Sequence, residues 1–308
     1  MYMKKIILVL VAVIILLIGV VTYFMMDRNP EVVTQDEQPV ATSTEQIENE
    51  DNNEPEEGPT VIGSSVDGKD ITAYRYGTGE DHLVFVGGIH GGYAWNTVLV
   101  AYELMDYLEN NREDIPENIR VTVIPTLNPD ALEVVVDAEG RFEEGDVDVN
   151  AAKTIASRLN SNDVDLNRNF DCDWQETGTW QSRDVSGGDK PFSEPESVAF
   201  RDFINNNEPA AVVVWYSAAG GVFASSCHND VSDETKDLTR IFADASGYRA
   251  YQEFDFYEIT GDMVNWLARE NIPAISVLLS SHTEVEWTEN RKGIEAIFDY
   301  YAKEGDTE

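Results

Sequence analysis

Basic residues are scarce in this sequence. Its 308 residues include 21 lysines and arginines against 58 aspartates and glutamates, which gives a formal net charge of −37 at pH 7. A surface this acidic repels the phosphate backbone of nucleic acids and the headgroups of anionic lipids. We therefore expect no nucleic-acid partner, and the simplest role of the charge is solubility. Apolar residues still make up 42% of the chain, which allows a sizeable core.

Cysteine is almost absent as well. The chain has two cysteines, Cys172 and Cys227, and both lie near the ends of predicted strands. A disulfide can form and persist outside the cytoplasm. The two residues are therefore candidates for a disulfide, and two buried free thiols are the alternative.

One apolar run is long enough to cross a membrane. It extends from Ile6 to Met26, follows Lys4 and Lys5, and would span roughly 30 Å of hydrocarbon as a helix. Basic residues before such a run favour a cytoplasmic N-terminus. The run ends in aromatic residues and methionines rather than in small residues, so a cleaved signal peptide is the weaker alternative. We expect residues 1–26 to be a single-pass anchor that leaves the C-terminal domain outside the cytoplasm.

The segment after this run lacks the composition of a folded domain. Residues 27–59 contain eleven acidic residues and one arginine, together with many polar residues and prolines. Such a segment cannot bury enough apolar surface to fold, and its like charges extend it. We therefore expect an acidic tether over residues 27–59 and a globular domain over residues 60–308.

The globular part alternates between strand and helix patterns. Residues 210–216 and 275–279 are continuous apolar runs, typical of strands that are buried on both faces. Further strands are expected over 71–76, 82–86 and 119–125, and helices over 96–109, 195–206, 232–245, 261–270 and 287–302. This alternation predicts an α/β domain with a mixed or largely parallel sheet. In such sheets ligands bind beyond the carboxyl ends of the strands.

Three segments near these strand ends carry the chemistry. The first is Gly87–Tyr93, which places His90 among glycines; the others are D-L-N-R-N-F at 165–170 and P-F-S-E-P-E at 191–196. Together they resemble the zinc carboxypeptidases of the carboxypeptidase A family. The resemblance continues through 128–130 and 257–262 and covers most of the globular part. It implies a three-layer α/β sandwich around a mixed, mostly parallel eight-stranded sheet.

The resemblance also implies a zinc site that this sequence lacks. The family binds zinc through a His, a Glu three residues further on, and a second His after a later strand. Here His90 matches the first ligand, but Tyr93 stands at the Glu position, or Ala94 if the spacing differs by one residue. Tyr216 stands at the second His position. Leu278 stands at the position of the glutamate that serves as the general base.

The residues that hold the substrate carboxylate in that family are still present. They correspond to Asn167, Arg168 and Tyr257. A single imidazole does not hold Zn²⁺ tightly, and leucine cannot accept a proton. We therefore predict a pseudopeptidase that needs no cofactor. Its expected ligand is a peptide C-terminus or a cell-wall stem peptide, bound through these three residues without hydrolysis.

Three alternatives remain open. Arg168 could form an internal salt bridge, in which case the domain would have a structural or protein-interaction role. Zinc could be bound by a rebuilt site of His90, His228 and one of the residues Glu284, Glu286 and His282 after the last strand, which would restore metallocarboxypeptidase activity. Ser217 could serve as a hydrolase nucleophile, although the G-x-S-x-G pattern is absent around it.

Overall fold

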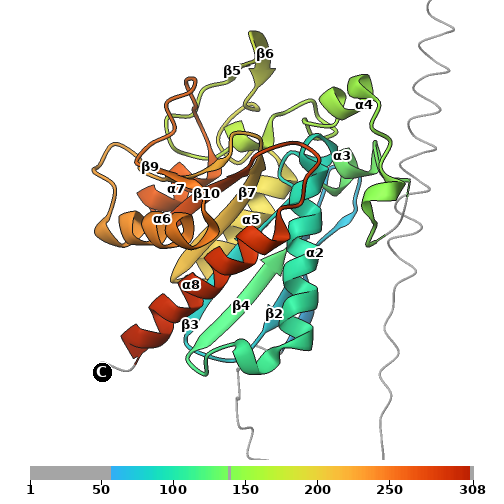
Figure 1. Cartoon of the computed structure of the whole chain (residues 1–308). Coiled ribbons are helices and arrows are strands. Elements are labelled where there is room, and N and C mark those ends of the chain that lie inside the picture. Colours follow the sequence, from blue (N-terminus) through green and yellow to red (C-terminus); the bar gives the residue numbers. More distant parts are fainter. Residues whose placement is uncertain (1–56, 138–139, 306–308) are drawn as a thin grey trace, which may run out of the picture. The chain divides into compact units, whose positions relative to one another are not determined.

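The computed structural model describes residues 57–137 and 140–305 of the chain (Figure 1). The predicted membrane anchor and nearly all of the predicted tether lie outside the described residues. Within the described part, none of the helices is both long and apolar enough to cross a bilayer. The first strand begins at Gly58, two residues before the predicted start of the globular domain.

A mixed sheet of eight strands forms the centre of the fold. Its strand pairs include four that are parallel and three that are antiparallel, so the predicted mixed, mostly parallel sheet is confirmed. Its order across the sheet is β1 (Gly58–Ser64), β2 (Asp70–Tyr76), β4 (Ile119–Ile124), β3 (Asp81–Val86), β7 (Ala211–Ser217), β10 (Ala274–Leu279), β8 (Gly221–Ala224) and β9 (Arg249–Tyr251). A separate hairpin of β5 (Thr177–Trp180) and β6 (Arg183–Ser186) projects from one end of the domain (Figure 1).

Helices cover both faces of the sheet and complete the predicted three layers. One face packs against α2 (Trp95–Asn110), α6 (Asp233–Ser246) and α8 (Trp287–Gly305), and the other against α5 (Pro195–Asn207) and α7 (Met263–Arg269). The remaining helical segments are short: α3 (Pro129–Glu133), α4 (Ala151–Ala156), and the 3₁₀ turns η1 (Gly91–Ala94), η2 (Arg112–Asp114), η3 (Glu144–Asp146) and η4 (Leu166–Arg168).

The apolar run of β7 shows why the sheet needs helices on both faces. Val213 and Trp215 belong to the core that contains α2, α6 and α8, whereas Val212 and Val214 belong to the core under α5 and α7. Alternate residues of a strand point to opposite faces, so a continuous apolar run is buried only when both faces are covered.

The helix boundaries follow from local chemistry. Ser232 caps α6, because its side chain accepts a hydrogen bond from the Thr235 amide at 3.1 Å. Pro195 occupies the first position of α5, where a missing N–H costs nothing. Helix α6 ends at Gly247, whose φ of 84° lies in the left-handed region that glycine adopts without strain.

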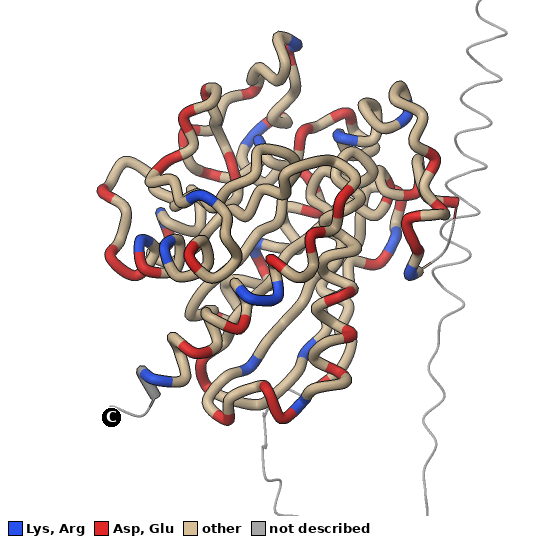
Figure 2. The backbone as a smooth tube through the Cα atoms, viewed as in Figure 1, with Lys and Arg blue, Asp and Glu red and all other residues tan. Residues whose placement is uncertain are grey.

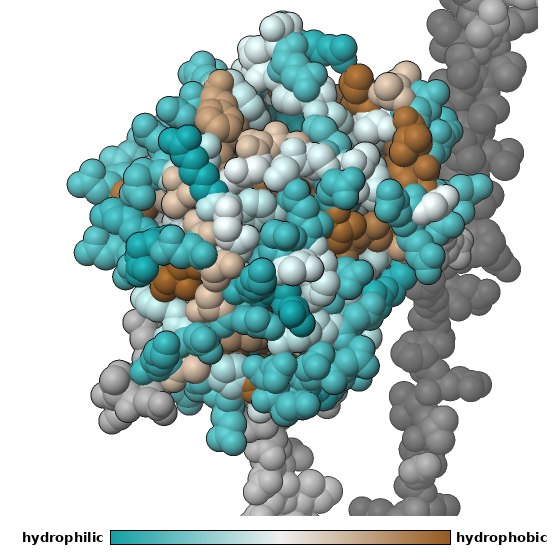
Figure 3. Space-filling model, viewed as in Figure 1, coloured by the Kyte–Doolittle hydropathy of each residue, from teal (hydrophilic) through white to brown (hydrophobic). Residues whose placement is uncertain are grey.

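Acidic side chains are spread over the whole described surface, and basic ones are fewer (Figure 2). The face shown in Figure 3 is largely hydrophilic, with small and separate apolar patches. This distribution fits the solubility role inferred from composition.

Candidate ligand-binding cleft

A cleft of about 980 Å³ opens at the carboxyl ends of three neighbouring parallel strands. His90 follows β3, Tyr216 lies near the end of β7, and Leu278 lies near the end of β10. Tyr216 and Leu278 are register partners. The topology therefore brings together the three predicted site positions that the sequence places far apart.

The two longest motifs are joined by one buried asparagine. The Asn169 side chain donates to Ser193 Oγ at 2.9 Å, and its carbonyl oxygen accepts from Ser197 Oγ at 2.6 Å and from the Glu194 amide at 3.1 Å. Asn169 directly follows η4, which carries Asn167 and Arg168. These hydrogen bonds fix the backbone that presents both residues to the cleft.

His90 is buried at the base of the cleft and is neutral at pH 7. Its Nε2 atom lies 3.3 Å from Asp165 Oδ1, but neither ring nitrogen has hydrogen-bond geometry with a partner. Burial, helped by the charge of Arg158, lowers the pKa of His90 to about 4. The ring is therefore a neutral imidazole with a free nitrogen, the form in which histidine binds metals.

A buried ion pair lies beside His90. Arg158 donates to Asp165 Oδ2 from Nε at 3.1 Å and from a terminal nitrogen at 2.9 Å. Its guanidinium also lies 4.5 Å from the ring centre of Trp180. Burial raises the pKa of Asp165, but the charge of Arg158, the contact with His90 and the charge of Arg168 together outweigh burial and hold that pKa below its ordinary value. Asp165 is therefore a carboxylate at neutral pH.

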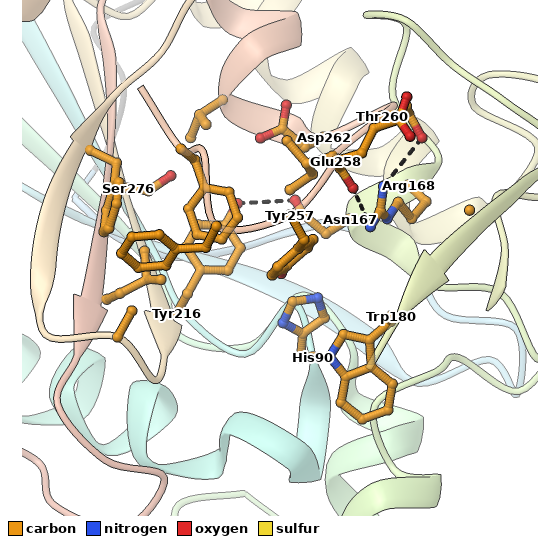
Figure 4. Close-up of a pocket in the computed structure, with 18 of the residues that line it drawn as sticks. His90, Asn167, Arg168, Trp180, Tyr216, Tyr257, Glu258, Thr260, Asp262 and Ser276 are labelled. Carbon is orange, nitrogen blue, oxygen red and sulfur yellow. Dashed lines mark hydrogen bonds between the residues drawn. The ribbon is translucent and has the colours of Figure 1, made fainter. Parts of the chain in front are cut away.

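Tyr216 occupies the predicted position of the second histidine ligand. Its side chain is buried, and its hydroxyl donates to Asn167 Oδ1 at 3.0 Å (Figure 4). The ring centre lies 5.8 Å from that of His90. Burial raises the pKa of Tyr216 well above its ordinary value, so the phenol keeps its proton. A protonated phenol that donates to an amide is a poor metal ligand.

The other two degenerate positions are also filled by packed side chains. Tyr93 packs edge-to-face against Trp180, with 5.0 Å between ring centres, and its hydroxyl accepts from Gln181 at 3.3 Å. Ala94 is buried next to it, and Leu278 is buried in the core under α5 and α7. The side chains at these positions are therefore aromatic or aliphatic, and none of them carries a carboxylate.

Arg168 is buried and lines the cleft, yet it has no acidic partner among the described residues. It donates to Thr260 Oγ1 at 3.2 Å and to the carbonyl oxygen of Glu258 at 3.2 Å (Figure 4). It also donates to the carbonyl oxygen of Thr179 at 3.0 Å. These acceptors are neutral, so the salt bridge considered from the sequence is not formed. Tyr257 is 45% exposed, and its ring centre lies 5.9 Å from the guanidinium carbon.

Asp262 adds a titratable acid to the same cleft. It is buried at the start of α7, where its side chain accepts from the Asn265 amide at 3.2 Å. Burial raises the pKa of Asp262 to about 7, against a smaller lowering by hydrogen bonds and by Arg168. Its charge therefore changes near neutral pH.

The structure places His90, Tyr93, Tyr216 and Leu278 around this cleft together with Asn167, Arg168 and Tyr257, and it adds others that sequence reasoning missed. Arg158, Asp165, Trp180 and Asp262 were given no role from the sequence. Asp165 lies inside the D-L-N-R-N-F motif, and Asp262 has the position of a helix N-cap, so both had a local signal. Trp180 comes from a short hairpin with no recognisable pattern.

Of the alternative site residues, Ser217 and His282 line the cleft, and the ring centre of His282 lies 4.5 Å from that of Tyr93, but the relocated zinc ligands do not converge on His90. His228 lies beside the Cys172–Cys227 disulfide and pairs with Asp173, and the carboxylate of Glu286 bonds to Tyr248 and to the Ser280 amide. Near His90, the described residues include no set of three His, Cys, Asp or Glu side chains with converging ligand atoms. The Ser217 hydroxyl donates to Asn96 Oδ1 at 2.8 Å rather than to a histidine.

Comparison with known protein families matches residues 53–300 to the zinc carboxypeptidase model. The chain belongs to the zinc carboxypeptidase family. Carboxypeptidase B of Astacus astacus is 29% identical over 150 residues, 46% of this chain and 48% of that enzyme. Gamma-D-glutamyl-L-diamino acid endopeptidase 1 of Lysinibacillus sphaericus is 24% identical over 245 residues, 73% of this chain. The chain spans 61% of the endopeptidase, so both matches cover less than two thirds of the relative.

Solved structures show the same fold. The murein-tripeptide amidase MpaA from Escherichia coli O157 has a TM-score of 0.56 at 20% identity, covering 80% of this chain and 92% of that chain. Bovine thrombin-activatable fibrinolysis inhibitor has a TM-score of 0.61 at 15% identity, covering 80% and 91%.

The family's zinc does not fit the residues at the base of this cleft. His90 offers a free ring nitrogen, but Tyr216 and Tyr93 keep their protons and Ala94 has no ligand atom, so neither of the other two ligand positions supplies one at neutral pH. A catalytic zinc site needs three protein ligands and an open position for water. This chain therefore belongs to the zinc carboxypeptidase family but lacks the set of zinc ligands that the family uses.

Proposed function

We propose that this protein binds the free carboxylate of a peptide in the cleft and does not hydrolyse the peptide. The observation that carries the proposal is the buried guanidinium of Arg168, which lines the cleft and pairs only with neutral oxygens. A buried charge without a counter-ion is costly. A carboxylate that enters the cleft would supply that counter-ion through a planar, charge-assisted contact.

Two neighbours of Arg168 support the same ligand. Tyr257 is half-exposed beside the guanidinium and can donate its hydroxyl to a bound carboxylate. Thr260 and the two carbonyl groups hold the guanidinium in one orientation before a ligand arrives. Preorganised donors reduce the entropy that binding has to overcome.

The side chains around His90 argue against hydrolysis. Hydrolysis by the family's chemistry requires a metal-bound water and a base to accept its proton. The protonated Tyr216 and the aliphatic Leu278 supply neither at the positions where the family has them. The chain therefore keeps the substrate-binding residues of its family without the residues that react.

Cell-wall stem peptides are the ligand class that we propose first. Two matching relatives are named for such chemistry: the gamma-D-glutamyl-L-diamino acid endopeptidase and Murein peptide amidase A of Escherichia coli, which is 46% identical over 72 residues. We also propose that Lys4, Lys5 and the apolar run 6–26 anchor the chain in a membrane, with the acidic segment 27–59 as a spacer. The cleft would then face the cell-wall side.

The test compares the full-length chain with its Arg168→Ala variant by calorimetric titration with a short peptide that has a free C-terminus. The expected result is binding by the parent chain and a loss of about 2 kcal/mol or more in the variant. The matched control is Arg240→Ala on α6, which removes an exposed arginine and should not change binding. A C-terminally amidated peptide should bind neither chain. Equal binding by the parent and the Arg168→Ala variant would leave a structural or protein-interaction role.

A further inference from the structure

A second cluster of possible metal ligands lies around the disulfide, outside the carboxylate cleft residues described above. The disulfide joins Cys172 to Cys227, whose Cα atoms are 6.1 Å apart. Each cysteine is followed directly by another possible ligand, Asp173 in one segment and His228 in the other. His228 Nε2 lies 3.1 Å from Asp173 Oδ1.

The possible ligand atoms of this cluster converge. Those of Cys172, Cys227 and His228 all lie within 4.8 Å of one another, the only such set of three in the described part of the chain. In a tetrahedral zinc site with bonds of 2.0–2.3 Å, neighbouring ligand atoms are roughly 3.5 Å apart. Small side-chain movements would therefore bring these atoms to coordination distance once the sulfurs are no longer bonded to each other.

The surrounding backbone holds the two segments in place independently of the disulfide. The Gly261 amide donates to the Cys172 carbonyl at 2.7 Å, and the Ser226 amide donates to Asn265 of α7 at 3.0 Å. These hydrogen bonds flank both cysteines. The site would therefore keep its framework when the disulfide is opened.

The exposed half of the cluster is accessible from solvent. The side chain of His228 is 69% exposed and that of Asp173 is 56% exposed. Both residues have positive φ values, 62° and 51°, a conformation that costs a non-glycine residue of order 1 kcal/mol and persists only when its surroundings fix it. The backbone of both residues is thus fixed, and their side chains lie at the surface next to the buried cysteines.

We propose that reduction of the Cys172–Cys227 disulfide turns this cluster into a binding site for Zn²⁺ or a similarly soft divalent cation. Cys172, Cys227 and His228 would supply three ligands, and the Asp173 carboxylate or a water the fourth. Two thiolates and an imidazole favour zinc over magnesium or calcium, which prefer oxygen ligands. The site does not depend on what the cleft binds.

The redox step balances with a dithiol as reductant. Two electrons and two protons pass from the dithiol to the disulfide, which yields two protein thiols and one oxidised dithiol. Zinc then displaces the two thiol protons, so its affinity rises with pH. The disulfide and the metal exclude each other, and each cross-links positions that are 55 residues apart in the sequence.

The test measures metal binding by the full-length chain before and after reduction with a phosphine that is removed without air. The expected zinc content is near zero per chain in the oxidised form and near one in the reduced form. With Co²⁺ as a probe, only the reduced chain should show thiolate-to-cobalt charge-transfer absorption. Cys172→Ser should abolish both signals, and His228→Ala should weaken zinc binding by more than about tenfold. Zinc should also raise the unfolding midpoint of the reduced chain, but not that of the Cys172→Ser variant.

Two results would overturn the proposal: a reduced, folded chain that binds no zinc, or zinc binding that persists in the Cys172→Ser variant. The His90→Ala variant separates this inference from the proposed function. Zinc that is bound equally before and after reduction and is lost in His90→Ala belongs to the cleft. That outcome would contradict the proposed disulfide-linked zinc site and also the absence of a zinc site in the cleft. Zinc that is bound only after reduction, and that is still bound by the His90→Ala variant, supports both of these claims.

Discussion

The hydroxyl of Tyr216 donates a hydrogen bond to Asn167 Oδ1 at 3.0 Å, across 49 positions of the sequence. The contact links the position of a lost metal ligand to a residue of the carboxylate-binding group. Asn167 Oδ1 also accepts from the Met263 amide at 3.2 Å. Tyr216 therefore does more than fill space, because it helps to orient the asparagine that remains from the family's binding site.

Removing this hydroxyl should destabilise the protein modestly. We expect Tyr216→Phe to lower the free energy of unfolding by about 1 kcal/mol, because the hydrogen bond is buried and one acceptor contact is lost. Urea unfolding followed by fluorescence measures the change. The control is Tyr74→Phe, whose hydroxyl has no hydrogen-bond partner among the described residues. If both variants lost the same free energy of unfolding, the hydrogen bond from Tyr216 to Asn167 would contribute nothing to stability.

Restoring hydrolysis should require several substitutions together. Tyr216→His alone adds a second imidazole but leaves the carboxylate ligand and the base missing. We expect no metal-dependent peptide hydrolysis from that variant, nor from Leu278→Glu alone. Combining Tyr216→His, Leu278→Glu and either Tyr93→Glu or Ala94→Glu is the smallest set that rebuilds the family pattern. Zinc-dependent hydrolysis by Tyr216→His alone would show that the cleft had not lost its chemistry.

The Arg158–Asp165 pair should contribute strongly to stability. Both side chains are almost fully buried, so Arg158→Ala leaves an unpaired buried carboxylate and should cost about 3–5 kcal/mol. The matched control is again Arg240→Ala, whose ion pair with Asp237 is exposed and worth less than about 1 kcal/mol. Thermal unfolding of both variants measures the difference. If both variants lost a similar amount of stability, the buried Arg158–Asp165 pair would not have the large contribution proposed for it.

Asp262 should make carboxylate binding depend on pH. Burial raises the pKa of Asp262 to about 7, so the residue is mostly neutral at pH 6 and mostly charged at pH 8. A charged Asp262 repels a carboxylate in the same cleft, so affinity should fall as pH rises through 7. Asp262→Asn should remove the dependence. Titrations at pH 6 and pH 8 measure the change in affinity for the carboxylate peptide. If the Asp262→Asn variant shows the same change in affinity between the two pH values, Asp262 is not the cause of the pH dependence.

The same residue should affect stability in a definite direction. Between about pH 4 and pH 7 the folded state keeps a proton on Asp262 that the unfolded state releases. The folded state therefore binds more protons in this range, and the contribution of Asp262 to stability is lost as pH rises. His90, with its pKa lowered to about 4, acts in the opposite sense, because unfolding lets it take up a proton below pH 6.5.

Sequence periodicity predicted most of the long elements, but it missed the seven-residue strand β1 and the short strands. The apolar runs of β7 and β10 and the amphipathic helices were predicted within two residues of their ends, except the end of α8. Strand β8 has four residues and follows a glycine turn, so it has no period to detect. The β5–β6 hairpin is polar and carries no alternating pattern, yet it supplies Trp180 to the cleft.

The candidate site was predictable only where a motif carried it. Asn167 and Arg168 lie in a recognisable stretch, and the topology brought them to His90 and Tyr216 as expected. Arg158 had no such signal, because a single arginine in a polar segment does not indicate which carboxylate it pairs with in the folded protein. Its role follows from the fold that places it within 3.1 Å of Asp165.

Zinc content tests the central claim most directly. The full-length chain, with its disulfide intact, is incubated with excess Zn²⁺, desalted and analysed for metal per chain by plasma mass spectrometry. We predict a ratio near zero, because Tyr216 and Leu278 stand where the ligands and the base would be needed. A ratio near one that disappears in the His90→Ala variant would contradict the degenerate site and would make this protein a metallopeptidase candidate.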